Sequence, residues 1–147
     1  MSILAKAPGA ARILLGAVFL VFGANGFLNF IPQPPPSADA LPFVGGLAAA
    51  GYFFPLLKAT EVVAGALLLA NRFVPLALSV LAPIVVNIVA FHLFLAPAGL
   101  ALALVMLALQ VYLAWSYRAA YRPMLAARVT PNTSESRALV DAHAAAH

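Results

Sequence analysis

Polar and ionisable side chains interrupt apolar stretches of the sequence at seven positions. These positions are Asn25, Asn29, Lys58, Glu61, Asn87, His92 and Gln110. An unpaired polar group in hydrocarbon is costly, so each side chain needs a partner or serves a function. Glu61 is the one carboxylate in the set, and an acid inside a membrane is a functional candidate by default. His92 can carry a proton near neutral pH. We therefore predict that Glu61 and His92 carry the chemistry.

The spacing of these residues suggests which of them share a helix face. Asn25 and Asn29 are four apart and Lys58 and Glu61 are three apart, so each pair lies on one face of a helix. Asn87 and His92 are five apart, which places them about 140° from each other around a straight helix. The latter two line one cavity only if their helix bends.

Each polar residue also has a structural interpretation that the sequence leaves open. The four amides can form interhelical hydrogen bonds of about 1 kcal/mol each. Lys58 can extend to the membrane interface, or pair with Glu61 as a purely structural ion pair. His92 can be an interfacial donor. A lone membrane histidine is weak evidence for metal, and no zinc motif, phosphate loop or catalytic triad is present, so we predict no metal site.

The elements that hold these residues are set by an unusually apolar composition. The chain has 147 residues, of which 65% are hydrophobic and 8% charged, whereas soluble domains average about 25% charged residues. A chain this short cannot bury so much apolar surface in water. These values exclude a soluble enzyme, a nucleic-acid-binding module and a disordered chain. The absence of cysteine excludes disulfides and thiolate chemistry.

The apolar stretches predict an all-α, polytopic membrane four-helix bundle. Spans of roughly 20 residues are needed to cross about 30 Å of hydrocarbon, and four are expected at about 13–31, 55–70, 73–96 and 98–117. The first is expected to remain as an uncleaved helix. These spans form one domain, 1–123, followed by a cytoplasmic, disordered tail at 124–147.

Two features refine this bundle. The segment 41–54 is too apolar for a free loop and too short to span, which predicts a re-entrant or interfacial segment folded over the outer end of the bundle. Arg12 and Asn25 in the first span are paralleled by Arg72 and Asn87 in the third. This weak internal repeat predicts two parallel helical hairpins.

Positive charges predict the orientation. Lys6 and Arg12 precede the first span, Arg72 lies between the second and third, and Arg118 and further arginines follow the fourth, whereas the other side carries only Asp39. Both termini are therefore expected in the cytoplasm. The pI near 10.0 reflects this topology and indicates no nucleic-acid partner. Six of the seven polar residues then converge on the outer half of the membrane, and Gln110 lies nearer the middle.

Five segments resemble the DoxX family of small four-helix bacterial inner-membrane proteins. They are 11–16, 25–27, 51–58 with Glu61-Val62, 71–78 and 87–92, and the likeness runs from about Arg12 to Pro123. The resemblance implies association with thiosulfate:quinone oxidoreductase, with a membrane complex of superoxide dismutase and a sulfurtransferase, or with resistance to quinones and catechols. The sequence departs from the expected family pattern at Asn29 and Gln110, where His and Glu are expected. This departure argues against a proton relay at those two positions.

Together these observations predict an inner-membrane accessory or subunit of an oxidoreductase complex, which binds a quinone or lipophilic aromatic in an outer-half pocket. Glu61 accepts a proton or anchors the ligand, and Lys58 tunes its charge. The remaining ligand contacts are assigned to Asn25, Asn29, Tyr52, Asn87, His92 and Gln110. Membrane lipid, a redox protein and a second copy of the chain are the expected partners. The alternative is a non-catalytic scaffold or small-solute transporter, and haem bound through His92 would need a second ligand.

Overall fold

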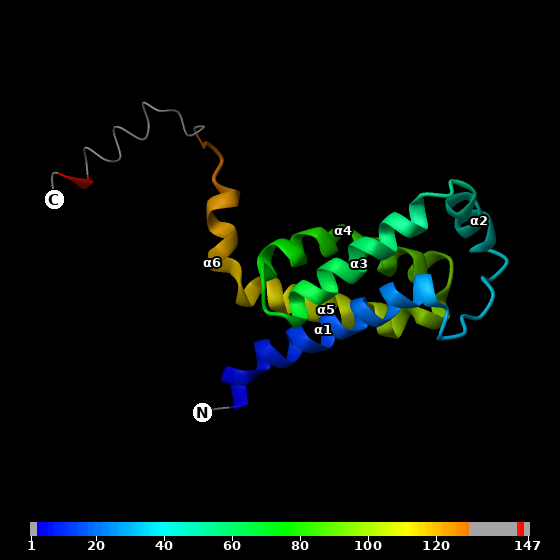
Figure 1. Ribbon diagram of the computed structural model, residues 1–147, viewed down its shortest axis with the longest axis horizontal. Helices are drawn as coiled ribbons and strands as arrows, with labels where there is room; N and C mark the ends of the chain where they lie inside the picture. The colour runs from blue at the N-terminus through cyan, green and yellow to red at the C-terminus, as the bar shows by residue number, and fades with distance from the viewer. Residues whose placement is uncertain (1–2, 130–143, 146–147) are drawn as a thin grey trace.

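The computed structural model describes residues 3–129 and 144–145, and this part of the chain is all-helical (Figure 1). The helices are α1 (Ile3–Leu28), α2 (Leu41–Ala49), α3 (Phe53–Leu69), α4 (Val74–Phe94), η1 (Pro97–Gly99), α5 (Leu100–Ser116), α6 (Arg118–Tyr121) and η2 (Arg122–Leu125). Alanine and leucine, both strong helix formers, dominate the long helices. The predicted all-α fold is confirmed. Most of the predicted tail, 124–147, lies outside the described residues.

Four long helices pack in a closed ring, in which α1 contacts α3, α3 contacts α4, α4 contacts α5, and α5 returns to α1. Figure 1 shows α2 at one end of this bundle and α6 at the other, together with the N-terminal end of α1. We call these the lid end and the α6 end. Successive long helices run in opposite directions between them, as the predicted hairpins require.

Three helical segments are long and apolar enough to cross a membrane: Lys6–Leu28, Val74–Phe94 and Pro97–Ser116. The fourth candidate is the pair α2 and α3, which bend by 93° at a short break. Gly51 supplies that bend with a φ of +72°, a conformation that glycine adopts without steric cost. By helix length and hydropathy the chain is thus a candidate multi-pass membrane protein, with one span or re-entrant segment made of a bent pair.

The structure corrects the predicted end of the first span. Helix α1 ends at Leu28 and not at Ile31, because Asn29 adopts the left-handed conformation with a φ of 51°. Its N–H donates to the carbonyl of Asn25 at 2.9 Å, a C-terminal capping arrangement in which asparagine is common. Asn29 therefore does not continue the helix face of Asn25, contrary to the spacing argument.

Small residues bring α1 and α3 together along the middle of the bundle. A Cβ at Gly65 would lie 2.6 Å from the backbone nitrogen of Leu20, and one at Gly16 would lie 3.1 Å from the carbonyl oxygen of Gly65. Such close backbone approach is how helices associate in lipid, where apolar burial gives little driving force. The buried core beside this contact contains Leu15, Phe19, Leu68, Leu78, Leu81, Val85 and Leu113. This packing fixes α1 and α3, and with them the side chains described next.

Candidate ligand-binding cavity

A cavity of about 550 Å³ opens between the long helices at the lid end. Its wall is aromatic and aliphatic, and contains Phe19, Phe22, Phe43, Phe53, Phe54 and Phe91. The polar side chains that reach it are Gln33, Lys58, Glu61, Asn87 and His92. A largely apolar pocket of this size with a few polar groups is typical of a small-molecule site.

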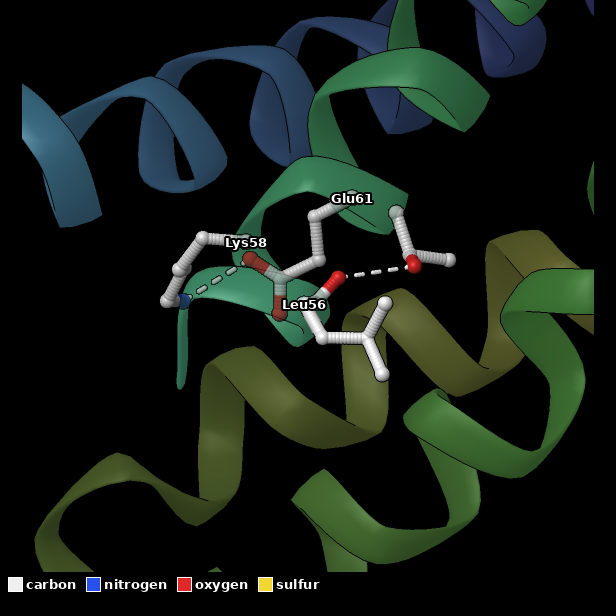
Figure 2. Close-up of polar contacts among 4 residues, drawn as sticks. Leu56, Lys58 and Glu61 are labelled. Carbon is white, nitrogen blue, oxygen red and sulfur yellow. Dashed lines mark hydrogen bonds and ion pairs between the residues drawn. The ribbon is translucent and has the colours of Figure 1, made fainter. Parts of the chain in front are cut away.

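Glu61 and Lys58 form an ion pair on the cavity-facing side of α3. The Nζ of Lys58 donates to Oε2 of Glu61 at 2.8 Å (Figure 2). Glu61 is buried, with 4% of its surface exposed, whereas a quarter of the Lys58 side chain remains exposed. The Lys58 stem packs over Gly26, where a Cβ would come within 2.4 Å of the lysine Cγ. Helix α1 therefore packs against the lysine stem. The prediction that Lys58 and Glu61 lie on one face of a helix is confirmed.

Only one of the two carboxylate oxygens of Glu61 is used by this pair (Figure 2). The second oxygen, Oε1, accepts no hydrogen bond from the described part of the chain. Glu61 lines the cavity, so its carboxylate can meet a ligand there. A buried carboxylate with an unused oxygen is a strong acceptor for a ligand hydrogen.

His92 is fixed at the end of α4 by one of its two ring nitrogens. Its Nδ1 lies 2.9 Å from the carbonyl oxygen of Ala96. A carbonyl oxygen cannot donate, so Nδ1 must carry the hydrogen, and Nε2 of the neutral ring has a lone pair. Gly99 makes room for this ring, because a Cβ there would lie 2.2 Å from Cε1 of His92. The orientation of the imidazole is thus set by the turn that follows α4.

Helix α2 covers the cavity. The ring centroid of Phe43 lies 5.9 Å from that of Phe91, which in turn meets His92 edge-on at 5.2 Å. Before α2, the hydroxyl of Ser37 donates to the carbonyl of Leu95 at 2.8 Å, which ties the loop to the end of α4. The predicted segment folded over the bundle is therefore present, and its aromatic side chains form part of the cavity wall.

The cavity brings together four of the eight predicted site residues: Lys58, Glu61, Asn87 and His92. Asn87 and His92 line it together although they are five residues apart.

The other four predicted residues lie elsewhere. Asn25 is buried, and its side chain bonds both the carbonyl and the N–H of Ile31 at 3.1 and 2.6 Å. Asn29 and Tyr52 are exposed, at the end of α1 and at the bend before α3. Gln110 is buried in α5, where its Nε2 donates to the carbonyl of Leu78 at 2.6 Å. None of the four lines the cavity.

The sequence analysis missed three residues that shape the cavity. Gln33 reaches it from the proline-rich connection, Phe91 joins the lid to the histidine, and Gly99 leaves space for the imidazole. A glycine in a short Pro-Ala-Gly turn, seven residues after His92, was the available signal for Gly99. Among the residues described, no cluster of three or more His, Cys, Asp or Glu side chains is placed to hold a metal ion.

Comparisons of the chain with protein-family models, with curated proteins and with solved structures found no match. The likeness to the DoxX family therefore enters below only as part of a proposal.

Proposed function

We propose that this protein is an integral membrane protein that binds a quinone or a similar lipophilic aromatic in the cavity at the lid end. The observation that carries the proposal is the cavity itself, which is large enough for a substituted aromatic ring and is walled by phenylalanines. Aromatic walls favour a planar ring through stacked or edge-on contacts. The few polar groups supply orientation, as in other small-molecule sites.

The proposed ligand contacts follow from the geometry of each side chain. Glu61 is the hydrogen-bond anchor or proton acceptor, with Lys58 holding its charge through Oε2. His92 offers Nε2, and Asn87 offers an amide whose side chain makes no hydrogen bond to the described residues. Proton exchange with a quinone needs such groups within a dry pocket.

The proposal includes a place in quinone-linked redox chemistry, as an accessory or subunit of an oxidoreductase. The chain contains no cysteine, so it holds no thiolate and no cysteine-ligated cluster to carry electrons. The bound quinone and a partner protein would supply electron transfer. The resemblance to the DoxX family supports this setting.

We also propose a bacterial inner-membrane location with both termini in the cytoplasm. The cations belong to segments at the α6 end, opposite the lid (Figure 1): Lys6 and Arg12 to the first half of α1, Arg72 to the turn between α3 and α4, Arg118 to α6 and Arg122 to η2. Cytoplasmic loops are enriched in such residues. The cavity then belongs to the outer half of the membrane, within reach of quinones dissolved in the bilayer.

The test is a calorimetric titration of the detergent-purified full chain with a short-chain ubiquinone and with the ubiquinol made by reducing it. We expect saturable binding of one ligand per chain, and the affinity for the ubiquinol should fall about tenfold, or about 1.4 kcal/mol, in Glu61→Gln and in His92→Ala. Tyr52→Phe is the matched control, because Tyr52 is exposed and outside the cavity. Unchanged affinity in both cavity variants would refute the site assignment.

One observation favours a scaffold or small-solute transporter as the second candidate. The side chains of Asn25 and Gln110 form hydrogen bonds with backbone groups, as do residues that stabilise the packing of a helical bundle. A purified protein that is colourless, binds no quinone and captures one consistent partner would favour this function. A Soret band in the same sample would instead indicate haem.

A further inference from the structure

We infer that the cavity selects the reduced, hydroxyl-bearing form of its ligand, a hydroquinone or other phenol, over the quinone with the same ring. This inference rests on the proposed function and adds the redox state that the site prefers. A quinone carries only acceptor oxygens, whereas each hydroxyl of a hydroquinone both donates and accepts.

The most buried of the polar side chains that line the cavity ends in an acceptor. Glu61 is 4% exposed and its Oε2 is occupied by Lys58, which leaves Oε1 with no donor in the described part of the chain. A carboxylate has no hydrogen to give, so a quinone carbonyl placed against it would set lone pair against lone pair. A ligand hydroxyl supplies the missing donor in a short, charge-assisted bond.

The second fixed group, His92, also presents an acceptor. Because its Nδ1–H is committed to the carbonyl of Ala96, the neutral ring has only the Nε2 lone pair left for a ligand. Gly99 and the edge of Phe91 constrain the ring in this orientation. Two independent elements, α3 and the end of α4, therefore present unmatched acceptors to the same cavity.

Donors are present, but a hydroxyl can use them as well. The Nζ of Lys58 retains hydrogens beyond the one directed at Glu61, and its side chain is a quarter exposed. Asn87 is exposed and can rotate its amide to give either group. A phenolic oxygen can donate to Glu61 while accepting from Lys58 or Asn87. A quinone carbonyl can only accept, and it leaves the buried acceptors without a partner, which is the costly outcome.

The decisive comparison uses three probes with one ring and one alkyl tail: a hydroquinone, its dimethyl ether and the corresponding benzoquinone. Each is titrated anaerobically into the detergent-purified full chain. We expect the hydroquinone to bind at least about tenfold more tightly than either of the others, which corresponds to about +30 mV in the potential of the bound two-electron couple. Equal or tighter binding of the quinone or the ether overturns the inference and leaves an aromatic-binding site in place. Failure of all three to bind overturns the proposed function instead.

Glu61→Gln gives the test in a variant. Glutamine keeps the shape of the side chain but adds an amide donor, so we expect hydroquinone affinity to fall, quinone affinity to rise and the tenfold preference to disappear. Gln110→Met is the control, since Gln110 is a buried polar residue outside the cavity, and it should retain the preference. Retention of the full preference in Glu61→Gln would contradict the inference. If Glu61→Gln fails to fold, the comparison of hydroquinone with its ether on the unaltered chain still decides the question.

Discussion

The two ends of the bundle differ in how their polar side chains are hydrogen-bonded. At the α6 end, Arg12 donates to the carbonyls of Leu68 and Leu69, and the hydroxyls of Ser79 and Tyr121 both donate to the carbonyl of Pro75. At the lid end, Glu61 and His92 each have one atom bonded and another free beside a cavity. Polar groups at one end complete the backbone, and at the other they are left half-engaged.

The difference separates polar residues that complete the packing from polar residues that remain available to a ligand. Both kinds are partly or fully buried, and both are costly to leave unpaired in lipid. A structural residue directs its hydrogen-bonding atoms at backbone groups, such as the carbonyls at a helix end that lack an intrahelical partner. A residue that remains available to a ligand has an atom without a hydrogen-bond partner in the described part of the chain, and it lies beside a cavity. Asn25 lies at the lid end but belongs to the structural kind, because Ile31 occupies both ends of its amide.

The largest effect should come from the α6 end, with Arg12→Met. The guanidinium of Arg12 caps the last carbonyls of α3, near the negative end of the helix dipole. Hydrogen bonds to a charged group are worth about 2 kcal/mol in net stability. We expect the variant to unfold at a distinctly lower temperature while its affinity for a hydroquinone is unchanged. Differential scanning fluorimetry in detergent measures the first and titration the second.

Arg72→Met is the matched control for that experiment. Arg72 is exposed at the turn between α3 and α4, and its side chain makes no hydrogen bond to the described residues. It should leave the unfolding temperature close to that of the unaltered chain. Equal destabilisation by the two substitutions would mean that Arg12 acts only as a positive charge, and the distinction drawn for the α6 end would be lost.

At the lid end, Gly99→Ala should lower ligand affinity more than it lowers stability. The added Cβ would lie 2.2 Å from Cε1 and 2.3 Å from Nδ1 of His92, so the ring must move and its bond to Ala96 is lost. Since a side chain can shift where backbone cannot, we expect about a tenfold loss of affinity, or about 1.4 kcal/mol. Gly45→Ala on α2 is the control, because nothing lies within 4 Å of its Cβ. Wild-type affinity in Gly99→Ala would remove His92 from the binding site.

The helices could be predicted from the sequence because hydropathy over about 20 residues reports span length directly. The prediction was wrong by a few residues at the end of α1, where Asn29 stops the helix in a left-handed conformation. Composition alone does not distinguish such an asparagine from one that continues the helix and hydrogen-bonds a neighbour. The residue at which α1 ends is set by the local turn geometry, which hydropathy does not report.

The site was predicted in part, and for a physical reason. Lys58 and Glu61 are neighbours on one helix, so their spacing was sufficient to pair them. The separation of Asn25 from the cavity depends on Ile31, a backbone partner beyond the helix end. Gly99 contributes because it has no side chain, which leaves space for the His92 ring. This role is visible only once the position of His92 is known. Partners across the bundle are set by packing, which a single sequence does not contain.

Tyr121 at the α6 end should give a smaller, pH-dependent effect. Burial raises the pKa of its phenol above the ordinary value of 10.0, by more than the neighbouring Ser79 hydroxyl lowers it. A raised pKa means that the folded state holds the proton more tightly than the unfolded state, so stability is full below about pH 10 and falls as the pH rises further. In Tyr121→Phe we expect a loss of about 1 kcal/mol at neutral pH from the missing bond to Pro75. The fall in unfolding temperature between about pH 9 and about pH 11 should also be shallower in this variant than in the unaltered chain.

The control for Tyr121→Phe is Tyr52→Phe, which removes an exposed phenol at the opposite end. It should change neither the unfolding temperature at neutral pH nor its dependence on alkaline pH. If both variants show the same profile, the alkaline decline belongs to other groups of the chain.

The smallest effect is expected for Gln110→Met. This variant tests whether every buried polar group at the α6 end contributes to the free energy of unfolding. The Nε2 of Gln110 donates to the carbonyl of Leu78, but its Oε1 is buried without a partner among the described residues. Methionine gives up the one bond and removes the orphaned oxygen, and these terms nearly cancel, since an unsatisfied buried acceptor costs about as much as a hydrogen bond contributes. We expect a change in unfolding free energy of less than about 0.5 kcal/mol in denaturant titration. A loss as large as that of Arg12→Met would show that Oε1 is satisfied by a bound water or by a second chain, so that both ends of the Gln110 amide are engaged, as both ends of the Asn25 amide are.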